Sequence, residues 1–372
     1  MLVAPDKYQG TLGAHDVAVA IARGIERSGA GPVELLPVAD GGEGTIHAVA
    51  SAMGAEIVET ATASDALGRP VEGAFALFDR GRTALIESAQ ASGLWRLAPH
   101  ERDPLRASTR GTGELITAAL DGGAQRIIVA VGGTATTDGG RGALEALGAQ
   151  FSRGAADLRR LRQQLRGVEL VVACDVRNPM CGPSGAAAVF GPQKGAGPET
   201  VKRLERRLRE WAALARSTTR RDPVAEQMSG AGGGLAGGLW AFAGAALRSG
   251  AALVLDTVGF DARVKQARAV VTGEGRLDEQ TLAGKAVFEV ATRSRQAGVP
   301  CYVVAGLDAL GPFGKRLLNV EAEAAAGPGG TASASAVERA AARLVPRGLP
   351  AAIPRLASAP PPRRSRGSSA PR

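Results

Sequence analysis

Short apolar runs recur along the chain, and each gives way to small or acidic residues. They have the length of buried strands and lie at residues 2–4, 34–38, 127–131, 169–173, 269–271 and 302–305. Amphipathic helical patterns separate several of these runs, at residues 16–26, 113–119 and 200–215, and a helix-start signal at 197–199 precedes the last of them. Strands that alternate with helices predict an α/β fold with parallel sheets, in which ligand groups gather at the carboxyl ends of the strands.

The pattern changes between residues 62 and 91, where a second subdomain is expected to begin. Residues 67–70 have the composition of a turn, and residues 73–78 and 83–86 have the pattern of a hairpin. From residue 346 onward the chain is rich in Pro, Ser and Arg and contains no acid, so we expect a disordered basic tail at 346–372.

Composition limits the classes of function. At 372 residues the chain is long enough for two domains, and its 51 glycines lie between apolar runs, which indicates many tight turns. The formal net charge is +9, but six arginines of the terminal stretch account for most of it, and about +3 remains without them. Aromatic content is only 3%, which leaves little surface for stacking bases. We therefore expect no nucleic-acid partner, although binding through the arginine tail stays an alternative.

Cysteine usage and the start of the chain indicate a cytoplasmic protein. Three cysteines without a pattern predict neither a disulfide framework nor a zinc site. No signal-peptide pattern precedes the first strand. The longest uncharged stretch, residues 229–247, is crowded with glycine and is better interpreted as a loop and a buried helix than as a membrane span.

The most informative stretch is residues 127–140, which read IIVAVGGTATTDGG. A buried strand there is followed by a glycine-rich loop. Because glycine has no Cβ, the backbone N–H groups of this loop could approach an anion closely. Asp138 adds a carboxylate that could bind a metal. The alternative is a tight strand-to-helix turn that happens to be rich in glycine.

Four further loops share this character. Two carboxylates lie among three glycines at 38–45, Asp175 ends another strand, residues 230–238 are mostly glycine before a helix expected to start near Leu239, and residues 272–285 combine acids, hydroxyls and two cations. Each loop alone could be only a turn. Together they supply carboxylates for Mg²⁺ and cations with N–H donors for phosphate, which favours phosphoryl transfer. The Walker A, Rossmann and Gly-x-Ser-x-Gly patterns all fail.

These segments resemble the bacterial glycerate kinases, which phosphorylate D-glycerate with ATP. The matching segments are 4–7, 38–45, 87–93, 108–114, 131–140, 173–176 with 178–179, 190–195 and 272–285. The resemblance implies two α/β domains: a discontinuous Rossmann-like domain from 1–61 and 265–345, and an inserted second domain at 62–264. It also implies ATP and Mg²⁺ as cofactors and D-glycerate in the interdomain cleft. The usual product in the family is 2-phosphoglycerate, although some members make the 3-phosphate.

On this resemblance, residue roles can be assigned as hypotheses. Asp40 is the candidate general base, against the alternative of a loop-stabilising Asx turn. Lys285 and Lys194 are candidates for neutralising charge on the transferred phosphoryl group. The alternative is that both are ordinary solvated lysines. The remaining candidates are substrate-binding Asp6, Lys7, Glu43 and Asp278, phosphate-binding Gly132, Gly133, Thr134, Thr136 and Gly139, and the Mg²⁺ ligands Asp138, Asp175 and Glu274.

Three departures from the family pattern qualify the hypothesis. Gln9 stands where a lysine is typical, Arg177 stands where an aspartate is common, and the region between 151 and 168 is short. They leave open a weakened family member that binds glycerate or a nucleotide without turnover. The hydroxyl that is phosphorylated and a homo-oligomeric state also stay open.

Overall fold

Two separate β-sheets form the framework of the protein in its computed structural model, which describes residues 1–8, 10–152, 154–174, 176–325 and 331–344. The first sheet contains, in sheet order, β13 (Val320–Ala324), β12 (Cys301–Asp308), β11 (Val270–Leu277), β1 (Leu2–Val3) and β2 (Glu34–Leu35). All of its pairings are parallel. Strands from the two ends of the chain therefore lie side by side in one sheet.

The second sheet is mixed. It contains, in sheet order, β10 (Ala246–Ser249), β9 (Glu169–Cys174), β6 (Arg126–Ala130), β5 (Thr83–Glu87), β4 (Pro70–Phe78) and β3 (Glu56–Ser64). The first four strands are parallel, and β4 pairs antiparallel with both β5 and β3. A separate hairpin joins β7 (Gln150–Ser152) to β8 (Ala155–Asp157). The α/β fold with parallel sheets and the 73–86 hairpin are thus confirmed.

Helices cover both faces of each sheet. The helices are α1 (Ala14–Arg27), α2 (Thr45–Met53), α3 (Ala89–Ser92), α4 (Arg110–Asp121), α5 (Arg141–Ala146), α6 (Arg159–Gln164), α7 (Ala186–Phe190), α8 (Pro198–Thr219), α9 (Leu235–Ala243), α10 (Gly250–Thr257), α11 (Phe260–Val264), α12 (Ala286–Gln296), α13 (Pro312–Leu318) and α14 (Ala334–Leu344). Among the described residues none of these helices is long and apolar enough to cross a membrane.

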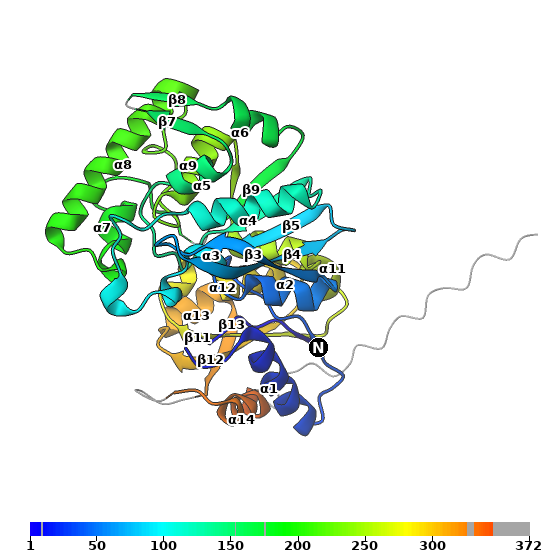
Figure 1. The fold of residues 1–372 in the computed structure, drawn as a ribbon. Helices are drawn as coiled ribbons and strands as arrows, with labels where there is room; N and C mark the ends of the chain where they lie inside the picture. Colours follow the sequence, from blue (N-terminus) through cyan, green and yellow to red (C-terminus); the bar gives the residue numbers. More distant parts are fainter. Residues whose placement is uncertain (9, 153, 175, 326–330, 345–372) are drawn as a thin grey trace, which may run out of the picture.

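Three apolar clusters hold the layers together. Helices α1 and α14 pack on the outer face of the first sheet, where Val17, Ile21 and Ile25 form the periodic stripe of α1. One cluster shared by both sheets takes in α2, α10, α11 and α12. Helices α4, α5, α8 and α9 cover the opposite face of the second sheet. Figure 1 shows α4 and α2 on opposite faces of that sheet, with α1 and α14 at the far end of the molecule.

One helix starts earlier than the sequence predicts. Helix α9 begins at Leu235 rather than near Leu239, so Gly237 and Gly238 lie inside it. A Cβ on Gly238 would lie 2.0 Å from the carbonyl oxygen of Gly139, and one on Gly237 would lie 2.7 Å from that of Ser229. Glycine is needed at these positions because the helix packs closely on distant backbone. The sequence does not distinguish this use of glycine from a loop, so the predicted helix start is wrong.

The domain boundaries at 61 and 264 stay a prediction. The first of them falls inside β3, which pairs in the second sheet. The expected tail at 346–372 lies outside the described residues, as do Gln9 and Asp175.

Candidate active site

Carboxylates and lysines meet at the carboxyl ends of the first sheet. A cavity of about 440 Å³ is lined there by five of the predicted residues, Asp6, Lys7, Asp40, Glu274 and Lys285. Asp6 and Lys7 follow β1, Asp40 follows β2, Glu274 lies inside β11, and Lys285 immediately precedes α12. The predicted loop at 272–285 therefore begins only after Leu277, because β11 extends to that residue through its pairing with β12. Because parallel strands end at the same edge of a sheet, residues about 270 positions apart in sequence share one cavity.

Strand register and hydrogen bonds hold Asp6 beside Glu274. The Asp6 backbone N–H donates to the Gly273 carbonyl at 2.8 Å, which continues the parallel pairing of β1 with β11. The Thr272 hydroxyl donates to the Ala4 carbonyl at 2.7 Å. The buried Tyr8 hydroxyl donates to the Val304 carbonyl at 2.6 Å and ties the loop after β1 to β12.

The acidic groups of this cavity disfavour one another's ionisation. Burial raises the pKa of Asp6 well above its ordinary value, and the charge of Asp40 raises it further. Burial raises the pKa of Glu274 to about 7, although the Thr281 hydroxyl, which donates to Glu274 Oε1 at 2.6 Å, and Lys285 oppose the effect. A bound cation would relieve this repulsion, so the donor chemistry fits a divalent metal.

Asp40 makes the loop-stabilising contact of one alternative and also lines the cavity in which the other alternative, a general base, would act. Its Oδ1 accepts the Gly42 N–H at 3.2 Å, which is the loop-stabilising contact of an Asx turn. The half-buried Asp40 also lines the cavity with Glu274 and Lys285. The turn therefore does not remove Asp40 from the site.

The other two predicted substrate ligands lie at the margins of this cavity. Glu43 lines an adjoining cavity of about 680 Å³ that shares Asp6 and Lys7 with the first. The Lys7 ammonium donates to the Glu43 carbonyl oxygen. Asp278 pairs with Arg276 at 2.9 Å, and Arg276 itself lines the first cavity.

Lys194 occupies a second, smaller site in the other sheet's half of the molecule. Only 3% of its surface is exposed, and its ammonium donates to the Thr136 carbonyl at 2.6 Å and lies 3.5 Å from the Thr134 hydroxyl. Burial lowers the pKa of Lys194 to about 8, whereas Asp138 opposes the shift. This lysine is therefore not an ordinary solvated one.

Lys194 lines a compact pocket. It measures about 90 Å³ and is lined by Gly132, Gly133, Thr134, Lys194, Gly232 and Gly233. The hydroxyl oxygen of Thr136, next to the Lys194 contact, is buried without a hydrogen-bond partner. Glycine N–H groups, a cation and the nearby start of α9 give this pocket the chemistry of an anion site.

Gly139 lies outside this pocket. A Cβ there would lie 2.5 Å from Cδ1 of Trp211, whose indole N–H donates to the Gly139 carbonyl at 2.9 Å. Gly139 therefore allows an aromatic ring to pack on the loop.

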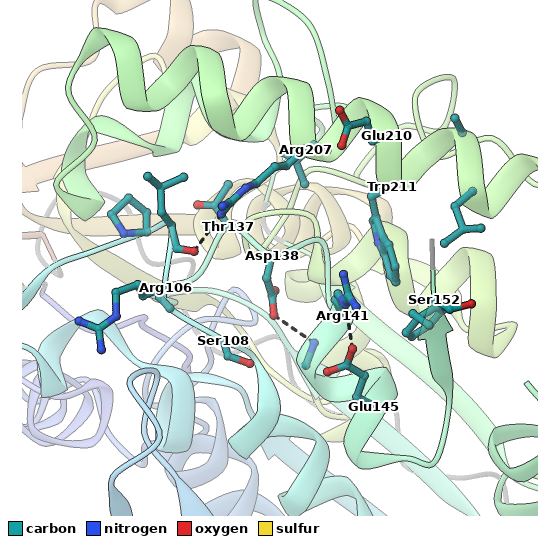
Figure 2. Close-up of a pocket in the computed structure, with 18 of the residues that line it drawn as sticks. Arg106, Ser108, Thr137, Asp138, Arg141, Glu145, Ser152, Arg207, Glu210 and Trp211 are labelled. Atoms are coloured by element: carbon teal, nitrogen blue, oxygen red, sulfur yellow. Dashed lines mark hydrogen bonds and ion pairs between the residues drawn. The ribbon is translucent and has the colours of Figure 1, made fainter. Parts of the chain in front are cut away.

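Asp138 bonds to residues at the starts of α4 and α5, and its carboxylate accepts four hydrogen bonds. It accepts the Thr109 N–H and hydroxyl, both at 2.9 Å, the Gly140 N–H at 3.0 Å and the Gly142 N–H at 3.1 Å. Asp138 lines a third cavity, which measures about 870 Å³. Figure 2 shows its carboxylate beside the Arg141–Glu145 ion pair. These contacts make Asp138 a cap for α4 and α5.

Two of the three predicted Mg²⁺ ligands, Asp138 and Glu274, are not brought together. Asp138 and Glu274 line different cavities, and Asp175 lies outside the described residues. Within the described part of the chain, no three acidic, His or Cys side chains already form a metal-binding group. Of the three predicted ligands, Glu274 has the surroundings that suit a cation.

Sequence reasoning missed one buried carboxylate and one hydroxyl. Glu87 ends β5 and accepts the Ile46 N–H at 2.7 Å, next to the loop that carries Asp40. The signal was present, because an acid directly after an apolar strand is also the pattern of Asp40. Thr281 was noted only as part of a hydroxyl-rich segment, and its contact with Glu274 needs the folded loop.

Known proteins similar to this chain share one description. Residues 1–345 match the glycerate kinase family. A protein named glycerate kinase from Bacillus subtilis (strain 168) is 41% identical over 326 residues, covering 82% of this chain and 84% of that protein. A protein named glycerate 2-kinase from Escherichia coli (strain K12) is 38% identical over 324 residues, with 82% and 84% covered. A crystal structure described as glycerate kinase 2 of Salmonella typhimurium LT2 superposes with a TM-score of 0.79 at 36% identity, covering 93% of this chain and 96% of that one.

Proposed function

The chain belongs to the glycerate kinase family of phosphotransferases, and from that premise we propose that it transfers the terminal phosphoryl group of ATP to the 2-hydroxyl of D-glycerate, with Mg²⁺. The observation that carries the proposal is the cavity in which Asp6, Asp40 and Glu274 face Lys7 and Lys285. It offers a base, a set of carboxylates for a cation and two lysines for an anionic substrate, which are the groups that phosphoryl transfer to an alcohol uses.

Asp40 is the proposed general base. It lies at the rim of the cavity, half-buried, and only one of its oxygens is engaged by Gly42. The other oxygen is available to accept the proton of the attacking hydroxyl. Lys7 and Lys285 line the same cavity and would bind the glycerate carboxylate, with Asp278 and Glu43 at its margins binding the hydroxyl that does not react.

The Lys194 pocket is the proposed site for phosphate groups of ATP. Its volume of about 90 Å³ suits one phosphate group, and its wall contains glycine N–H donors together with a buried ammonium. A charge that is already desolvated needs no reorganisation when the phosphate arrives, so it stabilises a developing negative charge strongly. The partnerless Thr136 hydroxyl supplies a further donor beside this pocket.

Asp6 and Glu274 would hold Mg²⁺. The ion supplies positive charge that offsets the charge spread over the phosphoryl oxygens. Burial raises the pKa values of both carboxylates, and the charge of Asp40 raises both further. They would therefore be ionised fully only when a cation is present. The expected cytoplasmic location and the absence of a nucleic-acid partner stay predictions.

Substitution of the proposed base tests this function. Asp40→Asn should reduce glycerate-dependent release of ADP by at least about a thousandfold. The substitution removes the general base, while asparagine keeps the size and shape of the side chain. Asp121→Asn, at an exposed carboxylate that ends α4, is the control and should retain normal turnover. Normal turnover by Asp40→Asn would remove Asp40 from the base role. Glycerate binding by the unaltered chain without any turnover would favour the weakened binding protein.

A further inference from the structure

A buried carboxylate outside the cavity is directed at the loop that carries the proposed base. Glu87 is the last residue of β5, and only 1% of its surface is exposed. Its Oε1 accepts the Ile46 N–H at 2.7 Å, and the Gly44 N–H also donates to this carboxylate. Both donors lie at the start of α2, directly after the segment 40–43. A side chain of the second sheet thus binds backbone that follows β2 of the first.

The same loop contacts two more strand ends of the second sheet. A Cβ on Gly41 would lie 3.0 Å from Cα of Gly250 and 3.4 Å from Cβ of Ala173, so the loop backbone packs directly on these residues. A Cβ on Gly250 would lie 2.0 Å from the Asp40 carbonyl oxygen. The Asp40 loop therefore rests on the ends of β5, β9 and β10. Of these three supports, Glu87 is the one that acts through a charged side chain.

Burial at this position disfavours the ionised form of the carboxylate, and its hydrogen-bond partners must offset that effect. Burial raises the pKa of Glu87, while the N–H groups of Ile46 and Gly44 and the charge of Lys7 lower it. The start of a helix also favours a negative charge. The strongest partners of Glu87 therefore belong to the Asp40 loop and α2, with only a 3.5 Å contact to Gln90 in its own half. An apolar residue at this strand position would fill the same space but would not bind the loop. The carboxylate therefore serves the loop rather than the sheet.

We propose that Glu87 is a positioning residue that fixes the distance between the proposed base and the phosphate pocket. This inference rests on the proposed function. Asp40 follows a strand of the first sheet, whereas Lys194 belongs to the half of the molecule built on the second. Transfer requires the attacking oxygen and the phosphorus to meet in line, and a displacement of about 1 Å can cost about a hundredfold in rate. By holding Ile46 and Gly44, Glu87 fixes the Asp40 loop to the half of the molecule that contains Lys194.

Substitution of Glu87 with a matched control tests the proposal in the full chain. Glu87→Ala removes the acceptor, and Glu87→Gln retains one oxygen for the Ile46 N–H. Asp65→Asn is the control, because Asp65 is 2% exposed in the same half of the molecule and accepts the backbone N–H groups of Leu67 and Arg69, at 2.8 and 2.9 Å. Its carboxylate bonds to Leu67 and Arg69, neither of which belongs to the Asp40 loop. Glu87 and Asp65 are thus both buried carboxylates that accept backbone N–H groups, but they hold different loops, and Asp65 also forms an ion pair with Arg69.

The proposal predicts a split between kinetic constants. In Glu87→Ala, kcat should fall by about ten- to a hundredfold while KM for ATP changes by less than about threefold, since the phosphate pocket is intact. Glu87→Gln should recover most of the lost kcat. Asp65→Asn should lower the melting temperature without changing kcat. Equal kcat in Glu87→Ala and Asp65→Asn, with similar losses of stability, would overturn the proposal and leave Glu87 as a structural residue.

Amide hydrogen exchange tests the same idea without relying on turnover. Backbone amides at 40–46 should exchange at least about tenfold faster in Glu87→Ala than in the unaltered chain, whereas Asp65→Asn should leave them unchanged. Unchanged exchange at 40–46 would overturn the positioning role whatever the activity. An unaltered chain without glycerate-dependent turnover would instead overturn the proposed function, while the exchange result would still decide whether Glu87 holds the loop.

Discussion

Glu274 should make the folded protein less stable as the pH rises, and Glu274→Gln should remove that dependence. Burial raises the pKa of Glu274 from 4.5 to about 7. The folded state therefore binds the proton more tightly than the unfolded state between these values, so this carboxyl stabilises the fold at low pH and loses that contribution as the pH rises through 7. At about 1.4 kcal/mol per pH unit, the whole effect is about 3 kcal/mol, of which roughly 2.5 kcal/mol falls between pH 5 and pH 8.5.

Glutamine has nearly the same shape and never ionises, and its carbonyl oxygen can accept the Thr281 hydroxyl in place of Oε1. Relative to the unaltered chain, Glu274→Gln should therefore gain about 2.5 kcal/mol of unfolding free energy between about pH 5 and pH 8.5. It should at the same time lose activity, because the substitution removes a carboxylate that is proposed to hold Mg²⁺. A gain in stability with a loss of activity is the usual outcome when a destabilising functional group is removed. Urea unfolding at the two pH values measures the gain, and the exposed Glu279→Gln is the control from the same segment. An equal effect of Glu274→Gln at both pH values would refute the reasoning.

Two further predictions concern the other half of the molecule. Because burial lowers the pKa of Lys194 to about 8, KM for ATP should rise by up to about tenfold per pH unit above that value as the ammonium loses its charge; a KM that stays flat between about pH 7 and pH 9.5 would exclude Lys194 from phosphate binding. Asp138→Asn should lower the unfolding free energy by about 1–3 kcal/mol, because the carboxylate accepts four hydrogen bonds. Its Mg²⁺ dependence should match that of the unaltered chain, and a weaker response to Mg²⁺ would reinstate Asp138 as a metal ligand.

Local patterns predicted the inner strands of both sheets and the edge strand β2, but not the edge strands β3, β10 and β13. Strand β6 (Arg126–Ala130) is apolar on both faces because both faces are covered, and α1 (Ala14–Arg27) has a stripe of apolar residues at helical spacing. The start of α9 was mistaken because Gly237 and Gly238 are required by tight packing against distant backbone. Glycine has the same appearance in a loop and at a close contact, so the sequence alone does not separate the two.

The candidate site shows the same division. Composition identified Asp6, Asp40 and Glu274, which do line one cavity, although Glu274 lies inside β11 rather than in the loop that was predicted there. Which loops meet depends on strand order, because β1 lies between β2 and β11 although β11 is more than 260 residues away in sequence. Asp138 has the same appearance as Asp40 in the sequence, since each is an acid within a glycine-rich loop. Only the four donors around Asp138 reveal that it caps helices.

Phosphorus NMR of the product tests the central claim most directly. The purified full chain would be incubated with ATP, Mg²⁺ and D-glycerate, and the new phosphoester resonance would be compared with those of 2- and 3-phosphoglycerate. The account predicts ADP together with 2-phosphoglycerate, and loss of both in Asp40→Asn. A 3-phosphoglycerate resonance would contradict the proposed regiochemistry, and the absence of any glycerate-dependent phosphoester would contradict the proposed function.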